Sequence, residues 1–95
     1  MAQELIASGF GTEWDGRYIM QYDTMNGNDD LWKHEDHEYY ILRNSWQWMI
    51  SDSYYFLNDN LLKAKKDYVE GSSPVGHYDG TVGNPPGDVA WENFP

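Results

Sequence analysis

The chain has 95 residues, a formal net charge of −10 and no cysteine, so it can form one small domain but no disulfide, thiolate zinc site or cysteine nucleophile. With only six Lys and Arg residues, its charge repels phosphate groups, and neither nucleic-acid binding nor adsorption to an anionic membrane is expected. Aromatic residues reach 17% of the sequence, so rings must fill most of the core, which favours a β-sheet over a helical bundle.

The first third of the sequence alternates short strand patterns with turn signals. Residues 5–10 form a short apolar run, and Asp15-Gly16 marks a turn after it. Residues 17–23 alternate with a period of two, which predicts a strand. Asn26-Gly27 is the strongest hairpin signal in the chain, and residues 31–34 begin the next short strand.

Two strand-like runs flank residues 44–45, an Asn-Ser pair, and predict a β-hairpin. With a two-residue loop, Arg43 faces Trp46 and Ile41 faces Trp48 across the hairpin. Aromatic–aliphatic pairs of this kind stabilise a sheet, so the face with the larger rings is taken as the core face. The residues expected in the interior are Tyr18, Tyr39, Trp48 and Ile50.

The second half of the sequence is less regular. Residues 54–57 and 75–78 are further strand candidates, and residues 60–67 are expected to form either one short helical turn or a loop. Residues 83–95 are rich in Gly and Pro, which predicts a C-terminal arm. The sequence therefore predicts an all-β domain over residues 1–82, built as a single small antiparallel meander of five to seven short strands.

The motifs WDGRY, NGNDDLW, YYILRNSWQWMIS, YYF and SPVGHYDG follow one another with a spacing that resembles a short, aromatic-rich all-β repeat module. That module runs G-x-Y, N-G, YYI, W-x-I and P-x-G, and it occurs as an accessory domain of phage structural proteins and of secreted adhesin-like proteins. Asp29 or Asp30 stands where the module prefers Pro, and Leu31 is an additional residue. The resemblance implies structural positions and no catalytic residue. The matching positions are Gly16, Tyr18, Asn26, Gly27, Trp32, Tyr39, Tyr40, Trp48, Ile50, Pro74 and Gly76.

Clusters of histidines and carboxylates raise the question of a metal site. His34 and His37 lie in HEDHE, which lacks the H-E-x-x-H spacing of zinc proteases, so a solvated acidic turn is expected. Residues 23–30 offer oxygen atoms suited to calcium but lack EF-hand spacing; a turn with solvated carboxylates is expected, with a calcium loop as the alternative. No Ser stands in a G-x-S-x-G context, so the sequence predicts no catalytic residue, resident metal or cofactor.

The five Trp, eight Tyr and three Phe residues are more rings than a thin sheet can hide, and exposed rings gather where proteins bind partners. We expect a non-catalytic binding or structural module, a virion surface, decoration or fibre-associated component that docks to other proteins. The alternative is a carbohydrate-binding module of an extracellular or adhesin-like protein. Either function places the chain on a virion or an extracellular surface, without insertion into a membrane, since no apolar run approaches roughly 18 residues. The expected binding residues are Trp14, Tyr40, Trp46, Tyr54, Trp91 and Phe94.

Overall fold

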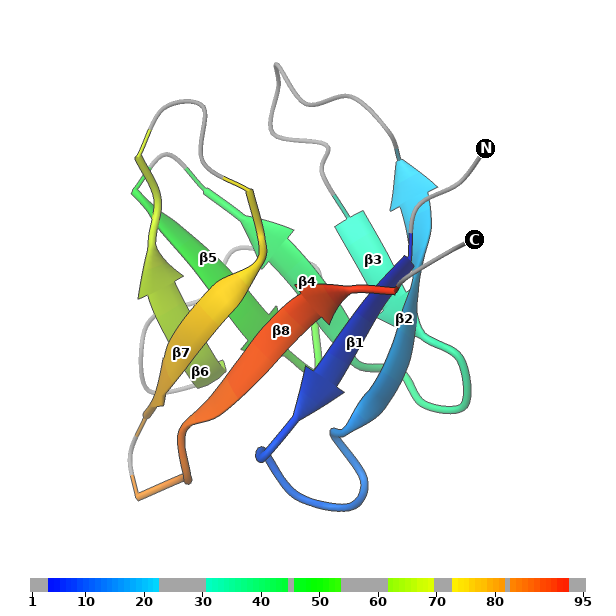
Figure 1. Ribbon diagram of the computed structural model, residues 1–95, viewed down its shortest axis with the longest axis horizontal. Coiled ribbons are helices and arrows are strands. Elements are labelled where there is room, and N and C mark those ends of the chain that lie inside the picture. Colours follow the sequence, from blue (N-terminus) through cyan, green and yellow to red (C-terminus); the bar gives the residue numbers. More distant parts are fainter. Residues whose placement is uncertain are drawn as a thin grey trace.

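The computed structural model describes residues 4–22, 31–44, 46–53, 62–69, 73–81 and 83–92. Within these ranges the chain forms eight β-strands, which pair in sequence order and close into one barrel (Figure 1). Every neighbouring pair is antiparallel, including the pair that joins the last strand to the first. The strands are β1 (Glu4–Ser8), β2 (Gly16–Tyr22), β3 (Leu31–His34), β4 (Tyr40–Arg43), β5 (Gln47–Ser51), β6 (Leu62–Asp67), β7 (Gly76–Gly80) and β8 (Gly87–Trp91).

The predicted fold class, a small all-β antiparallel domain, is confirmed by this architecture. The number of strands is higher than the predicted five to seven, because two segments that were not predicted as strands form β6 and β8. The strand candidate at residues 54–57 and the predicted turn at residues 23–30 lie outside the described residues. No helix in the described part of the chain is long and apolar enough to cross a membrane.

The prediction of a helical turn or loop near residues 60–67 was wrong over β6. Ala64 is buried in the barrel interior and Leu62 on the outward side of the sheet, because the register with β5 shifts between Ile50 and Ser51. Strand β6 pairs with β5 on one side and with β7 on the other. Pairing on both sides supplies partners for the backbone groups, and it outweighs the helix propensity of Leu, Lys and Ala in this segment.

The predicted C-terminal arm over residues 83–95 contains strand β8, which pairs with both β7 and β1 and so closes the barrel. Gly87 shows why this segment needs small residues: a Cβ atom there would lie 2.5 Å from the carbonyl oxygen of Ser8 and 2.8 Å from the Phe10 ring. The glycine that suggested an irregular arm is therefore a site of close backbone approach inside a sheet. Residues 87–91 belong to the barrel.

The hairpin between β4 and β5 forms with a register two residues away from the predicted one. Arg43 lies opposite Trp48, not Trp46. Asn44 accounts for this shift, because its side-chain oxygen accepts hydrogen bonds from the backbone N–H groups of Trp46 and Gln47, both at 2.9 Å, and its own backbone N–H donates to the Gln47 carbonyl oxygen at 3.0 Å. A shift of two residues returns every side chain to the same face of the sheet, so the predicted core face is correct although the cross-strand partners are not.

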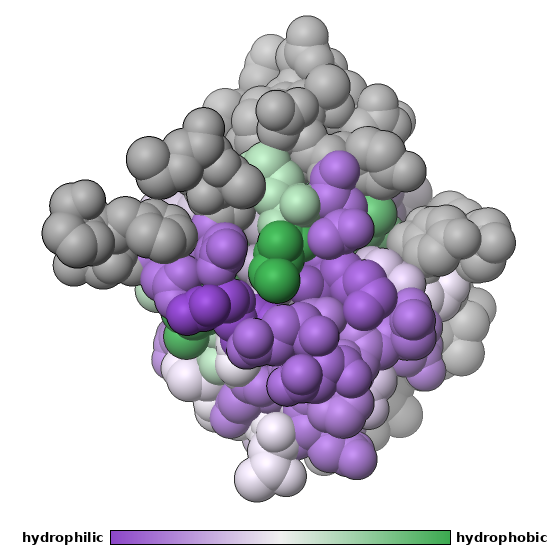
Figure 2. All heavy atoms as spheres, turned by 90° about the vertical axis from the view of Figure 1, so that its right-hand side faces the viewer, coloured by the Kyte–Doolittle hydropathy of each residue, from purple (hydrophilic) through white to green (hydrophobic). Residues whose placement is uncertain are grey.

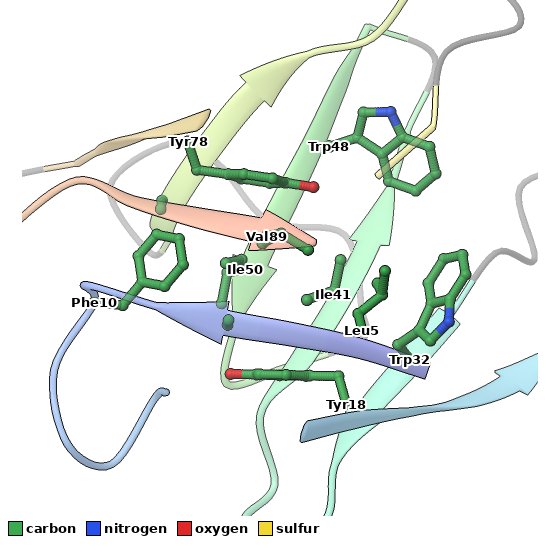
Figure 3. Close-up of a cluster of buried hydrophobic side chains, with 11 residues drawn as sticks. Leu5, Phe10, Tyr18, Trp32, Ile41, Trp48, Ile50, Tyr78 and Val89 are labelled. Carbon is green, nitrogen blue, oxygen red and sulfur yellow. The ribbon is translucent and has the colours of Figure 1, made fainter. Parts of the chain in front are cut away.

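Aromatic rings fill the barrel interior, as the composition predicted (Figure 3). Tyr18, Trp48 and Ile50 are fully buried as expected, and Tyr39 is half-buried against the same cluster. An eight-stranded barrel is just wide enough for side chains to fill its interior. The buried cluster consists of Leu5, Ala7, Phe10, Tyr18, Trp32, Ile41, Trp48, Ile50, Ala64, Tyr78 and Val89.

Two of the buried rings carry hydroxyl groups that find backbone partners. The Tyr18 hydroxyl donates a hydrogen bond to the carbonyl oxygen of Trp14 at 2.7 Å, and the Tyr78 hydroxyl donates to that of Pro74 at 2.6 Å. Burial raises the pKa of both phenols above the ordinary value. Each tyrosine therefore supplies a large apolar ring to the core and ties it to a connection between strands.

A second apolar cluster lies on the outward side of the sheet. It consists of Tyr40, Leu42, Met49 and Leu62, with Leu31 packed against it. Ile41 between Tyr40 and Leu42 points into the barrel, so β4 is buried on both faces. This explains why β4 and β5 read as nearly continuous apolar runs instead of alternating strands.

Candidate functional site

The meander places alternate connections at opposite ends of the barrel. Because all pairs are antiparallel, β2, β4, β6 and β8 finish at one end, which we call the Trp91 end after the last residue of β8. The opposite end, the Trp14 end, carries the connections from β1 to β2, from β3 to β4 and from β7 to β8. Both ends carry aromatic residues, so each is a candidate site.

Trp14 closes its end of the barrel as part of a stack. Its ring lies 3.9 Å from that of Tyr39 at an interplanar angle of 9°, and His37 stacks on Tyr39 in turn at 5.1 Å. The ammonium group of Lys63 lies over the Trp14 ring, 5.5 Å from its centroid. Tyr39 stacks on Trp14 and the Lys63 ammonium lies over the same ring, so this ring, predicted as a binding residue, is already engaged within the fold.

His34 connects two loops at the Trp14 end. Its Nδ1 accepts a hydrogen bond from the Asp36 backbone N–H at 3.0 Å, so its Nε2 carries the proton and donates to the Asp15 carbonyl oxygen at 2.9 Å. Only 4% of His34 is exposed, whereas the sequence predicted a solvated turn. Both ring nitrogens are thus used within the fold. In the described part of the chain, no group of three or more His, Asp and Glu side chains is arranged to hold a metal ion.

A row of contacting rings crosses the Trp91 end. Trp91 meets Trp32 edge to face at 6.2 Å, and Trp32 lies 6.1 Å from Trp48. Trp48 then meets Tyr68 at 5.9 Å, and the Arg43 guanidinium lies over Tyr68 at 4.4 Å from the ring centroid. The buried members of this row hold the outer ones in fixed positions, which gives this end a rigid aromatic rim.

The exposed apolar side chains lie at this same end. Among the described residues, the large hydrophobic side chains that are exposed are Trp46 (58%), Val69 (68%) and Trp91 (36%). Trp46 belongs to the connection from β4 to β5, and Val69 follows β6. The backbone N–H of Tyr68 donates to the carbonyl oxygen of Trp46 at 3.0 Å, so Val69 directly follows the residue that is hydrogen-bonded to Trp46. The Trp91 end therefore carries two apolar contacts, one at Trp46 and Val69 and one at Trp91.

The charged groups near Trp91 are unevenly balanced. Arg17 pairs with both Glu4, at 3.1 Å, and Glu92. A hydrogen bond to the Glu92 side chain and desolvation raise the pKa of Glu4, and the Arg17 charge offsets them only in part. Two carboxylates thus share one guanidinium beside the end of β8.

The other described cations of this end are held by the fold. Lys66 donates from its Nζ to the carbonyl oxygen of Ser73 at 2.8 Å, and burial lowers its pKa. Arg43 is buried over the rings of Tyr68 and Trp48. Arg43 and Lys66 therefore direct their positive charge into the molecule, whereas Lys65 is half-buried on the outward side of β6, opposite Met49.

The outer wall over the first three strands carries few apolar groups (Figure 2). The face over β1, β2 and β3 is mostly hydrophilic, with one small hydrophobic area (Figure 2). Ile6 and Ile19, on the paired strands β1 and β2, are half-buried. Small, isolated apolar areas of this kind are ordinary on a protein surface, so the wall is a weaker candidate than the Trp91 end.

The predicted binding residues divide into three groups. Trp46 and Trp91 are exposed at the Trp91 end, whereas Trp14 is stacked at the other end. Tyr40 was expected at the surface but is only 7% exposed; it lies in the outward cluster, and its hydroxyl donates to a Glu38 carboxylate oxygen at 2.5 Å. Tyr54 and Phe94 lie outside the described residues. Val69, Glu4 and Glu92 were not predicted, because their importance depends on strands β6 and β8, which the sequence analysis did not assign.

No protein-family model, curated protein or solved structure matches this chain. The class of the protein is therefore defined by its fold and site alone. It is a closed eight-stranded antiparallel barrel with a side-chain-filled interior and exposed aromatic residues at one end.

Proposed function

We propose that this chain is a non-catalytic binding module that docks onto another protein through the Trp91 end of its barrel. The observation that carries the proposal is the position of Trp46, Val69 and Trp91, the exposed large apolar side chains of the described residues, at one end. Aromatic anchors set in a rigid, partly polar surface are typical of the energetic centres of protein interfaces.

The closed sheet restricts how a partner can bind. Every strand is hydrogen-bonded on both sides, so no open sheet edge accepts an added strand from a partner. Recognition must then come from side chains at the ends or on the outer wall. This restriction supports the Trp91 end, where the exposed ring of Trp91 packs against the buried ring of Trp32.

The kind of assembly is proposed from the sequence pattern. The aromatic motifs resemble accessory modules of phage structural proteins. A compact barrel with exposed apolar residues at one end suits a virion surface, decoration or fibre-associated component. On this proposal the chain acts at a virion or extracellular surface, with other protein chains as its partners.

The second candidate function is that of a carbohydrate-binding module in an extracellular or adhesin-like protein. It is favoured by the Trp91 ring, which is partly exposed and fixed against Trp32, with the carboxylate of Glu92 next to it in sequence. Such a ring could stack on a sugar while a nearby oxygen accepts hydrogen bonds from hydroxyl groups. Protein docking is preferred because Trp46 and Val69 add a second apolar contact.

Single-residue variants test the two functions. Trp46→Ala and Trp91→Ala are expected to weaken capture by purified virions or cell envelopes by about tenfold each, with little change in melting temperature for Trp46→Ala. Asp88→Ala, on the outer wall, serves as the control, because its exposed side chain lies away from the Trp91 end. A glycan-array signal that Trp91→Ala abolishes, without protein-dependent capture, would favour the carbohydrate function. Unchanged binding by both Trp variants in both assays would refute both functions.

A further inference from the structure

The charges that flank the exposed apolar groups indicate what kind of protein surface fits the Trp91 end. Asp67, the last residue of β6, is exposed two residues before Val69. Glu92 directly follows Trp91, and its backbone N–H donates to the Glu4 carbonyl oxygen at 2.8 Å. Each of the two apolar contacts therefore has a carboxylate beside it on the same rim.

Most described cations of this end are engaged within the fold. Arg43 is buried over Tyr68 and Trp48, and the ammonium group of Lys66 is bonded to a backbone carbonyl. Lys65 is half-buried two residues before the exposed Asp67, and Arg17 is shared between Glu4 and Glu92, which leaves one negative charge in excess there. The side chains of Glu4 and Glu92 are 21% and 18% exposed, against 43% for Arg17, so an incoming cation would meet an exposed carboxylate at Asp67 and a part-buried one at Glu92.

We propose that the partner bound at the Trp91 end presents a basic segment, in which apolar side chains contact Trp46, Val69 and Trp91 while Arg or Lys side chains reach Asp67 and Glu92. A guanidinium can bind a carboxylate through parallel hydrogen bonds and can lie on an indole ring. The formal charge of −10 over the whole chain also attracts such a partner at long range. This inference rests on the proposed docking function and names the chemistry of its partner.

Trp91 and Glu92 point to opposite sides of the same rim, because consecutive residues of a strand do so. Leu5, which pairs with Trp91, is part of the barrel core, so Trp91 faces the mouth of the barrel. The carboxylate of Glu92 pairs with Arg17 on the outer wall. A bound segment must therefore cross the rim, with its apolar side chain over the mouth and its cation outside it.

The pKa of Glu4 agrees with this arrangement. A hydrogen bond to Glu92 is the largest cause that raises it, which means that the two carboxylates are close enough to disfavour full ionisation despite Arg17. A second cation at this point would favour the ionised form of Glu4. Binding of a basic segment is therefore expected to release a fraction of a proton at mildly acidic pH.

The test uses a short peptide that alternates Arg with Leu and Gly, and a matched peptide in which citrulline replaces Arg and removes only the charge. The full chain is titrated with each peptide while the indole N–H signals of its five Trp residues are followed by NMR. The Arg peptide is expected to shift the signals of Trp46 and Trp91, and the citrulline peptide is not. Raising the ionic strength from about 0.1 M to about 1 M, which shortens the Debye length from about 10 Å to about 3 Å, should weaken binding.

A matched pair of variants separates a specific site from general attraction to an acidic protein. Asp67→Asn/Glu92→Gln removes two carboxylates from the Trp91 end, and Glu13→Gln/Asp52→Asn removes two exposed carboxylates from the opposite side of the fold. The first pair is expected to weaken binding of the Arg peptide about fivefold or more, and the second by less than about twofold. Equal losses in the two variants, or equal binding of the citrulline peptide, would overturn the proposal.

The same variants distinguish failure of this inference from failure of the docking function. In the capture assay with virions or envelopes, a loss caused by Trp91→Ala but not by Asp67→Asn/Glu92→Gln contradicts a basic partner and leaves docking intact. No loss with either variant contradicts docking itself. Losses with both variants, together with weaker capture at high salt, support both proposals.

Discussion

At the scale of single residues, two tryptophans in the same hairpin have opposite roles. Trp48 lies inside the barrel and is fully buried, whereas Trp46, two residues earlier, is more than half exposed in the connection before β5. Alternation alone would place both on one face of a strand. The difference arises because Asn44 pairs with Gln47 and bonds to the Trp46 backbone N–H, which leaves Trp46 in the turn before β5. The residue type therefore does not decide which of the two tryptophans is buried and which is exposed.

This contrast gives a paired stability prediction. Trp48→Ala is expected to lower the free energy of unfolding by about 3–5 kcal/mol, because it removes a large ring from a filled interior and leaves a cavity. Trp46→Ala is expected to change it by less than about 0.5 kcal/mol. Urea unfolding followed by circular dichroism measures both. Similar effects for the two variants would contradict the assignment of Trp48 to the core.

The buried phenols predict how stability depends on alkaline pH. The folded-state pKa values of Tyr18 and Tyr78 lie above the ordinary value of 10.0 because burial disfavours the phenolate. The folded chain therefore holds these protons where the unfolded chain releases them. Their contribution to stability is fully present below about pH 10 and is lost as the pH rises through the folded-state pKa values.

Ultraviolet titration of tyrosine ionisation measures this effect. Of the eight Tyr residues, Tyr18 and Tyr78 are expected to ionise only together with unfolding, after the exposed ones. The variant Tyr78→Phe serves as the comparison, since it lacks one of the two late-ionising groups and should show a correspondingly smaller late step. Smooth ionisation of all tyrosines before any loss of near-ultraviolet circular dichroism would contradict the buried hydroxyl contacts.

At the scale of secondary-structure elements, the alternation of apolar and polar residues predicted which face of the sheet a side chain occupies. It did not predict which residue lies opposite on the neighbouring strand. The period-two patterns placed Tyr18, Trp48 and Ile50 in the interior, since a strand that is half-buried must alternate. The register of the β4–β5 hairpin was not predictable from propensity, because it depends on side-chain hydrogen bonds within the loop. The face assignment survived because the error was an even number of residues.

Strands β6 and β8 are elements that the sequence pattern did not predict. In β6, residues with helix propensity such as Lys65 and Lys66 form a strand, because pairing on both sides decides the structure. In β8, Gly87 is required by the close approach of Ser8 and Phe10, although glycine normally signals a loop. The exposure of Trp46 and Trp91 was predicted from the surplus of aromatic rings. Val69 and the flanking carboxylates could be recognised as part of the site only from the positions of these two strands.

At the scale of the whole molecule, closure of the barrel organises both the core and the candidate site. An even number of antiparallel strands returns the chain to the end where it started, and the backbones of Glu4 and Glu92 are hydrogen-bonded there. The same topology brings the ends of β6 and β8, with their exposed apolar residues, to one rim. A small chain of this kind thus obtains a core without disulfides by leaving no strand unpaired.

The last prediction tests whether β8 is a structural strand of the barrel or a removable arm. A chain that ends at residue 82 lacks β8, so β1 and β7 each lose a partner and Val89 is missing from the core. Such a chain is expected to lose its cooperative thermal transition and to aggregate through its two open edges. A chain that ends at Glu92 keeps all eight described strands and serves as the control. Calorimetry and near-ultraviolet circular dichroism compare the two with the full chain. Cooperative melting of the shorter chain near the temperature of the full chain would mean that residues 83–95 do form an arm, and that the rim at Trp91 is not part of the folded domain.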